Sequence, residues 1–108
     1  MKKYAVNLTS EAISDMNAAN SFMTGFYSDE RRIELMGELR DEILSLDTMP
    51  LRYRIPPFPI CEELGLHRML VGQYSVFYSV DEDDESVTVT DIIWSAADFE
   101  NWLGRRYM

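Results

Sequence analysis

The clearest pattern in the chain is the strict alternation of residue types across positions 74–80. Tyrosines and valines alternate there with serines and a phenylalanine, so the two sets of side chains lie on opposite faces of a strand. An apolar run at 66–71 precedes this segment, and Gly72 and Gln73 connect the two. A two-residue connection with glycine in its first position fits the primed turns of β-hairpins. The pattern therefore predicts an antiparallel hairpin.

Two further strands and two amphipathic helices are predicted around this hairpin. Residues 3–8 form the first strand, and residues 87–94 form the last. Between the first strand and the hairpin, apolar residues recur at steps of three and four, which is typical of helices that bury one face. The buried positions expected from this spacing are Ile13, Met16, Ala19 (or Asn20) and Met23 in the first helix, and Ile33, Met36, Leu39 (or Arg40), Ile43 and Leu46 in the second.

Both helices have recognisable ends, because side-chain oxygens can accept the unpaired N–H groups of a first helical turn. The expected caps are Thr9 or Ser10 for the first helix and Ser28 or Asp29 for the second. Gly25 is expected to end the first helix. Gly37 lies inside the second helix, where glycine costs about 1 kcal/mol of helix propensity. We therefore expect it to mark a close approach of the two helices.

The segment 48–64 contains all four prolines of the chain. Because proline has a fixed φ and no N–H group, we expect neither a helix nor a central strand in this segment. A final helix is predicted over 96–103, beginning after Ser95 and ending at Gly104.

The resulting order is β-α-α-β-β-β-α in one domain over residues 1–108. It predicts an α+β fold, in which a helical hairpin packs on one face of a small, mostly antiparallel sheet. The single cysteine, Cys61, cannot form an internal disulfide, and no long apolar segment is present. We therefore expect a cytoplasmic protein without a signal peptide or membrane span.

The charge of the chain is strongly negative, with a net value of −9. Residues 81–93 carry six acidic and no basic side chains, whereas residues 51–80 have a small positive excess. An acidic chain is a poor general nucleic-acid binder, because such binding neutralises phosphates, so we expect no sequence-specific DNA binding. An anionic partner would dock on 51–80. The acidic turn at 81–85 lacks the glycine and spacing of a calcium loop, so we expect it to be solvated.

The sequence contains no Gly-rich phosphate loop, no G-x-S-x-G motif and no Cys/His spacing for zinc, so we expect no metal and no cofactor. Cys61 is interpreted as a small buried hydrophobic residue. The remaining polar constellation consists of Arg52, Arg54, His67, Arg68 and Tyr74. The two arginines before the hairpin are predicted to point away from the core, toward solvent or a ligand.

This constellation has the residue types that RNA cleavage by a 2′-hydroxyl would require. His67 and Arg68 are the catalytic candidates, because histidine moves protons near neutral pH and arginine binds phosphate through its planar fork. The three arginines and the tyrosine are candidate contacts to a phosphate or a target. In the alternative interpretation, Arg68 pairs with Glu62 or Glu63 and His67 only satisfies a strand edge.

Several short motifs occur in an order that a known family shares. They are Leu8 and Thr9 with Glu11 and Ala12, 43–46 with Met49 and Pro50, then 65–68, 71–74, 76–80 and 92–94. Together they resemble the RelE/ParE superfamily of type II toxins, the plasmid-stabilisation proteins, over nearly the whole chain. The resemblance implies a small α+β toxin whose partner is a cognate antitoxin encoded next to it.

The superfamily has two known activities: one branch cleaves messenger RNA in the ribosome, and the ParE-like branch poisons DNA gyrase by binding. The chain resembles the ParE branch more closely, because the ribonuclease branch commonly has basic residues where this chain has Leu70 (or Val71) and Ser75. The resemblance therefore implies growth inhibition by binding to gyrase. The alternatives are a ribosome-dependent mRNA interferase that uses the polar constellation, and an inactive antitoxin-binding homologue.

Overall fold

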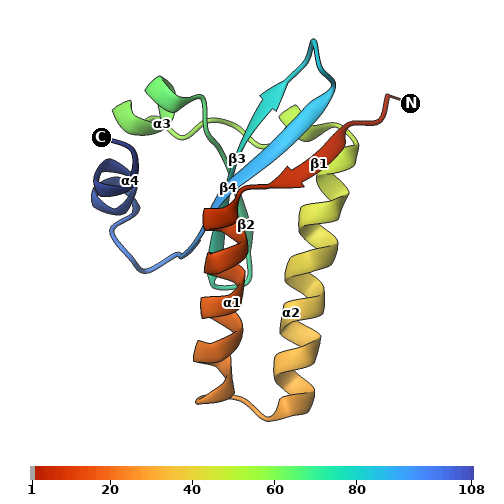
Figure 1. The fold of residues 1–108 in the computed structure, drawn as a ribbon, viewed down its shortest axis with the longest axis vertical. Coiled ribbons are helices and arrows are strands. Elements are labelled where there is room, and N and C mark those ends of the chain that lie inside the picture. Colours follow the sequence, from red (N-terminus) through yellow and green to blue (C-terminus); the bar gives the residue numbers. More distant parts are fainter. Residues whose placement is uncertain (1) are drawn as a thin grey trace.

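The computed structural model describes residues 2–108 and has an α+β architecture (Figure 1). Its elements are β1 (Ala5–Leu8), α1 (Ser10–Thr24), α2 (Asp29–Leu44), two short 3-10 helices (Ser45–Asp47 and Pro50–Arg52), α3 (Pro59–Leu64), β2 (His67–Val71), β3 (Tyr74–Asp81), β4 (Ser86–Trp94) and α4 (Phe99–Tyr107). The strands form one sheet in the order β1-β4-β3-β2. Only β1 and β4 are parallel among these pairs, which confirms the mostly antiparallel fold.

The predicted hairpin at the centre of the sequence is confirmed. β2 and β3 are antiparallel, with Val71 paired to Tyr74 across the turn. Gly72 has a φ of 55°, a left-handed conformation that glycine adopts without strain. The last strand, β4, lies between β1 and β3 and is therefore an inner strand of the sheet.

The helical hairpin of α1 and α2 lies against one face of the sheet and extends past it (Figure 1). Thr9 caps α1 by accepting the Ala12 N–H at 3.1 Å, and Ser28 caps α2 by accepting the Arg31 N–H at 3.2 Å. Both caps were among the expected ones. The core on this face joins both helices to the sheet through Ala12, Leu39, Ile43, Leu46, Met69, Val76, Tyr78, Val87, Val89 and Ile92.

Two of the predicted buried helix positions are wrong. Ile13 is 51% exposed, because α1 turns Ala12 and Ala19 toward the sheet instead. Ile33 is 63% exposed, because the buried residues of α2 lie further along the helix, at Leu39 and Ile43. The close approach predicted at Gly37 is also wrong, since within residues 2–108 no atom of another element lies within 4 Å of the position that a Cβ would take there.

The opposite face of the sheet is covered by α3 and α4, whereas the sequence pattern predicted helices packed on one face only. A second core joins these helices to the sheet through Cys61, Leu66, Phe77, Ile93 and Leu103. Phe77 faces this core, whereas its neighbours Val76 and Tyr78 face the helical hairpin, as their alternation predicted. The molecule therefore has three layers, with the sheet in the middle.

The prediction that 48–64 contains no helix is wrong. α3 begins at Pro59, in the first turn of a helix, where a missing N–H group costs nothing because that group has no partner in the helix. The helix ends at Gly65, whose φ of 67° is the left-handed conformation typical of a helix end. The prolines therefore limit the helix at its start without excluding it.

The last helix begins later and ends later than the predicted 96–103. Asp98, and not Ser95, caps α4, because its carboxylate accepts the Asn101 N–H at 3.3 Å. The chain stays helical through Gly104, where we expected it to end. Side chains of the last turn are held by the sheet, and these contacts offset the helix propensity that glycine lacks.

A β-bulge in β4 reverses the direction of its side chains. Phe77 pairs with Asp91 and Tyr78 pairs with Val89, so Thr90 is the extra residue that has no partner on β3. Val89 contributes to the core under the helical hairpin, whereas Asp91 faces α4. The bulge thus brings a fully buried carboxylate to the side of the sheet where the last helix lies.

This buried carboxylate joins three elements. The Arg106 guanidinium on α4 donates to Asp91 at 2.6 Å and to Asp15 on α1 at 3.0 Å. Asp15 also accepts the Ile92 N–H at 3.0 Å, on the stretch of β4 that extends past β1. The Tyr107 hydroxyl donates to Asp91 at 2.9 Å. Together these bonds attach the end of α4 to the rest of the fold.

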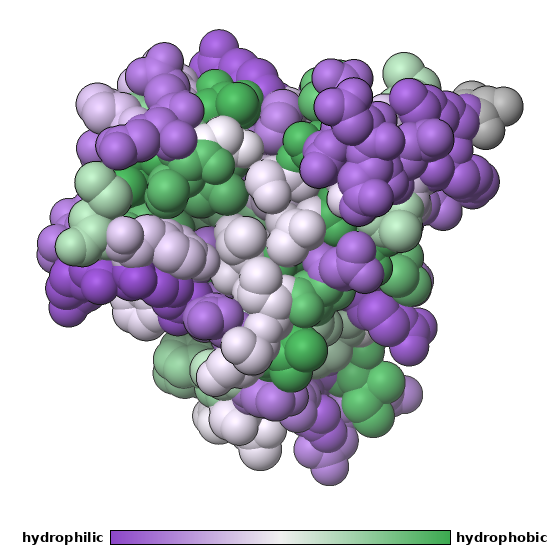
Figure 2. Space-filling view, turned by 45° about the horizontal axis from the view of Figure 1, so that its top comes forward, coloured by the Kyte–Doolittle hydropathy of each residue, from purple (hydrophilic) through white to green (hydrophobic). Residues whose placement is uncertain are grey.

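The acidic turn at 81–85 is exposed along its whole length, as expected. Figure 2, with this end of the molecule turned forward, shows hydrophilic atoms gathered near the N-terminal end and hydrophobic patches elsewhere. No helix within residues 2–108 is both long enough and apolar enough to cross a membrane.

Candidate functional site

His67 faces the helical-hairpin side of the sheet, and its ring is engaged there. Nδ1 lies 2.7 Å from the Tyr53 carbonyl oxygen, which can only accept, so this nitrogen carries the proton. The imidazole also stacks on the Tyr78 ring, with centroids 5.2 Å apart. These contacts are those of a histidine that satisfies the edge of a strand.

Arg68 is the next residue on β2, so its side chain lies on the opposite face. Its Nε donates to Ser75 Oγ at 3.0 Å, and Ser75 Oγ lies 3.1 Å from Ser95 Oγ. The guanidinium lies 4.7 Å from the centre of the Phe99 ring. Within residues 2–108, Arg68 forms no ion pair, so the alternative interpretation, in which it pairs with Glu62 or Glu63, is wrong.

The arginines of the proline-rich segment have different surroundings. Arg52 is exposed, but its guanidinium donates to the Thr48 carbonyl at 2.6 Å and to Ser45 Oγ at 2.9 Å. It therefore stabilises the end of the helical hairpin. Arg54 has an exposed side chain, and its carbonyl accepts the Arg68 N–H at 3.2 Å. Both side chains are exposed, as predicted, but within residues 2–108 only the Arg52 guanidinium is held by the surrounding backbone.

The predicted constellation is therefore not assembled in one place. His67 and Arg68 lie on opposite faces of the sheet, and Tyr74 lines a groove beside the helical hairpin. Cys61 is buried in the second core, and burial raises the pKa of its thiol, so it is not an activated nucleophile. In the part of the chain that the structure describes, no group of acidic, histidine and cysteine side chains is placed to hold a metal ion.

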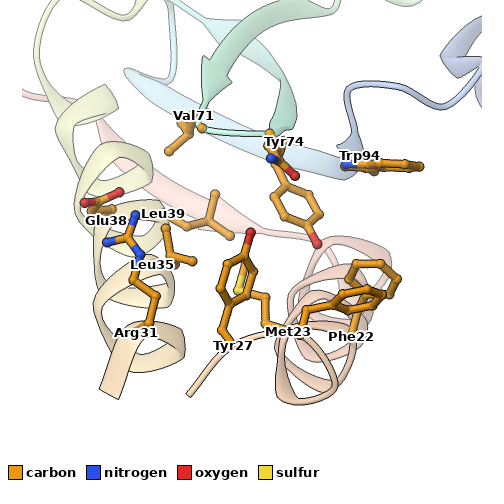
Figure 3. Close-up of a pocket in the computed structure, with 13 residues that line it drawn as sticks. Phe22, Met23, Tyr27, Arg31, Leu35, Glu38, Leu39, Val71, Tyr74 and Trp94 are labelled. Atoms are coloured by element: carbon orange, nitrogen blue, oxygen red, sulfur yellow. The ribbon is translucent and has the colours of Figure 1, made fainter. Parts of the chain in front are cut away.

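The groove that includes Tyr74 has a volume of about 520 Å³ and lies between the helical hairpin and the turn of the β-hairpin (Figure 3). Three parts of the chain form it: the end of α1 with the following connection, one side of α2, and the ends of the sheet strands. The lining residues are Phe22, Met23, Phe26, Tyr27, Arg31, Leu35, Glu38, Leu39, Val71, Gly72, Gln73, Tyr74 and Trp94.

Exposed aromatic rings are the main feature of this groove. Phe26 is 71% exposed and Phe22 is 53% exposed, and the two rings stack with centroids 4.7 Å apart. The Trp94 ring lies 6.4 Å from Phe22. Sequence reasoning missed these residues, because they end a helix and a strand and their exposure depends on how the two elements meet. Tyr74 was the only groove residue named as a candidate.

The polar groups of the groove are few. Arg31 is paired with Glu34 at 2.7 Å, whereas Glu38 has no ion-pair partner within residues 2–108. The Tyr27 and Tyr74 hydroxyls point into the groove (Figure 3). Burial and the neighbouring Tyr27 raise the pKa of Tyr74, so its hydroxyl stays protonated at neutral pH.

A family model for the ParE toxin of the type II toxin–antitoxin system parDE matches residues 6–99. The fold and this match define the chain as a toxin of a type II toxin–antitoxin system. It belongs to the ParE toxin family, within the RelE/ParE superfamily that the sequence motifs resemble. A comparison with curated proteins finds no match.

Solved structures of the superfamily have the same fold. The chromosomal ParDE system from Pseudomonas aeruginosa has a TM-score of 0.71 at 12% identity, covering 87% of this chain and 98% of that one. The RelBE2 complex from Mycobacterium tuberculosis has a TM-score of 0.62 at 20% identity, covering 85% and 98%. A mutant Escherichia coli RelE toxin in the free state has a TM-score of 0.62 at 12% identity, covering 98% and 99%.

Proposed function

We propose that this ParE-family toxin inhibits DNA gyrase in the cytoplasm by binding to it and that it does not cleave RNA. The observation that carries the proposal is the separation of His67 and Arg68 on opposite faces of β2. Cleavage through a 2′-hydroxyl needs a base, an acid and positive charge around one phosphate. No such group of side chains converges at β2.

The surroundings of Arg68 support the same conclusion. Ser75 accepts its Nε–H group at 3.0 Å, in a place where a second cation would be needed to stabilise a phosphorane. The net charge of −9 opposes docking on a ribosome, because such docking depends on contacts to phosphate. Because no carboxylate within residues 2–108 pairs with Arg68, this side chain is available to an anionic group of a target protein, as is the exposed Arg54.

An antitoxin partner is supported by the family and by the solved complexes that share the fold. The ParDE and RelBE structures that resemble this chain come from toxin–antitoxin systems. We propose that a small protein encoded next to this chain binds it and relieves its toxicity. Binding need not involve the same residues as inhibition of the target.

The proposal is tested by adding the purified toxin to gyrase, ATP and relaxed plasmid DNA. We expect the toxin to inhibit supercoiling. In a translating extract, we expect an mRNA to stay intact with the wild type, and equally intact with the double variant that carries His67→Ala and Arg68→Ala. If the wild type cleaves that mRNA and the double variant does not, the proposal is contradicted and the chain is an mRNA interferase.

A chain that inhibits neither gyrase nor translation, but still binds its antitoxin, would be the inactive homologue. Circular dichroism of each preparation shows whether a negative result comes from unfolded protein. The two assays and the binding measurement together distinguish all three functions that the sequence left open.

A further inference from the structure

We propose that a hollow beside the end of α2 receives a segment of the target protein that is apolar and carries carboxylates. The hollow has a volume of about 420 Å³, and its lining residues are Lys2, Tyr4, Met49, Pro50, Leu51 and Arg52. The site rests on the proposed function in one respect, because it assumes that the toxin inhibits a protein by binding to it. It does not require that protein to be gyrase.

The hollow is formed where the chain leaves the helical hairpin beside the first strand (Figure 1). The Tyr4 N–H group donates to the Asp47 carbonyl at 2.8 Å, and the Lys3 ammonium pairs with the Asp47 carboxylate at 3.2 Å. These bonds hold the start of β1 against the 3-10 helix Ser45–Asp47. The hollow therefore lies between two parts of the chain that are fixed to each other before any partner binds, which lowers the entropy cost of docking.

Met49 presents an apolar side chain from a strained backbone conformation. Its φ of 48° lies in the left-handed region, where a residue with a Cβ is strained and glycine is not. The Arg52 guanidinium holds this turn, since it donates to the Thr48 carbonyl at 2.6 Å and to the Met49 carbonyl at 3.1 Å. The Met49 side chain is 63% exposed, and Leu51 is 49% exposed. The turn would form more easily with glycine, so the strained, exposed methionine is typical of a contact surface and not of a structural need.

Two cations line the hollow without a carboxylate beside them. Within residues 2–108, neither Lys2 nor Arg52 forms an ion pair, and Arg52 donates to carbonyl and hydroxyl oxygens. The Lys2 ammonium lies 5.5 Å from the centre of the Tyr4 ring. These charges make the hollow locally positive in a chain with a net charge of −9. Charge complementarity therefore favours an occupant whose carboxylates stand next to apolar side chains.

The surroundings of the hollow disfavour other anionic occupants. The Ala5 N–H group donates to the Glu85 carbonyl at 2.9 Å, so the acidic turn at 81–85 lies beside the start of β1. A broad anionic surface, such as a membrane or a nucleic acid, would meet these carboxylates as well as Lys2, and like charges oppose association. A second copy could offer its own acidic turn, but residues 81–85 are all acidic and supply no apolar side chain. The favoured occupant is therefore a narrow segment of a different protein.

The first test measures the toxin concentration that half-inhibits supercoiling by gyrase, together with growth arrest after induction without antitoxin. Met49→Gly and Leu51→Ser should each raise that concentration at least about tenfold and relieve the growth arrest, as expected for central apolar contacts. Met49→Leu keeps the apolar side chain and should inhibit like the wild type. Ile33→Ser removes a similarly exposed side chain outside the hollow and should change inhibition by less than about twofold.

The second test separates charge and stability from contact. Lys2→Glu should weaken inhibition about fivefold, whereas Arg40→Glu, which changes the net charge equally at an exposed position of α2, should weaken it by less than about twofold. Thermal melts accompany each variant. Met49→Gly should melt no lower than the wild type, because glycine adopts the left-handed conformation without strain. Its loss of inhibition is then a loss of contact and not of folding.

The outcomes distinguish the hollow from the target. Full inhibition and full growth arrest by Met49→Gly and Leu51→Ser would overturn the hollow and leave gyrase as the target. If the wild type does not inhibit gyrase, but only these variants lose growth arrest, gyrase is wrong and the hollow docks another protein. A wild type with neither effect would overturn both. Self-association, binding to anionic vesicles or antitoxin binding that Leu51→Ser alone abolishes, with inhibition kept, would assign the hollow to that occupant and overturn the proposal.

Discussion

Tyr78 is the largest side chain that the fold buries completely. It lies on the face of β3 that the alternating pattern assigned to the core, and its hydroxyl donates to the Pro50 carbonyl at 2.6 Å. Burial raises the pKa of this phenol above its usual value. One residue therefore links the predicted hairpin to the proline-rich segment, whose path the sequence did not reveal.

Substitution of Tyr78 should show how much this link contributes. Tyr78→Phe keeps the ring but leaves a buried carbonyl without a partner, so we expect a loss of about 1–3 kcal/mol in the free energy of unfolding. Tyr78→Asp should prevent folding, because it places a carboxylate in the core. Urea denaturation followed by circular dichroism measures both. A native-like transition for Tyr78→Asp would mean that this face of β3 is not the buried one.

Asp91 should be as sensitive as a core residue, although it is charged. Asp91→Ala removes a buried partner of Arg106 and of the Tyr107 hydroxyl, and we expect a loss of about 3 kcal/mol or more. Arg40→Ala breaks an exposed ion pair with Asp41 and should change stability by less than about 1 kcal/mol. Equal effects in urea titrations would contradict the role of Asp91 in holding α4.

The Tyr107 phenol predicts a loss of stability at alkaline pH. Burial and the Asp91 carboxylate raise its pKa to about 12, above the value of about 10 expected in an unfolded chain. The folded state therefore holds this proton more tightly, and the resulting stability is complete below pH 10 and lost as the pH rises from about 10 to about 12. Tyr107→Phe should show a smaller fall in urea-unfolding free energy between pH 9 and 11. An unchanged fall would assign it to other groups, such as Tyr78.

At the scale of elements, local sequence patterns predicted most of the helices and strands correctly. The hairpin turn, the caps at Thr9 and Ser28 and the facing of β3 follow from neighbouring residues and were predicted correctly. α3 and the length of α4 were missed, because both helices depend on contacts to a sheet face that is distant in sequence. A proline in a first turn and a glycine inside a helix are compatible with helix once such contacts exist.

Two glycine substitutions, one inside a helix and one in a turn, test how the elements depend on backbone conformation. Gly37 lies inside α2 with free space around it, so Gly37→Ala should stabilise the protein by about 1 kcal/mol. Gly72→Ala should destabilise it, because its φ of 55° is unfavourable for alanine. Thermal melts of both variants measure the difference. A lower melting temperature for Gly37→Ala would mean that the position is more crowded than the structure shows.

At the scale of the molecule, the three layers determine which side chains can act together. Two helices cover each face of the sheet, so the side chains of strand neighbours such as His67 and Arg68 enter different layers of the molecule. Composition and motifs identified the residue types but not this separation. The aromatic groove was likewise beyond prediction, since Phe22 and Trp94 come together only when the helical hairpin packs against the sheet.

We propose that the chain acts by binding gyrase, and the most direct test is pulse labelling of cells after its induction without antitoxin. Incorporation of thymidine and of leucine is followed over the first minutes. We expect DNA synthesis to stop first, and co-expression of the antitoxin to restore it. Leucine incorporation that stops before DNA synthesis, with fragmented mRNA, would contradict this account and indicate a ribosome-dependent ribonuclease.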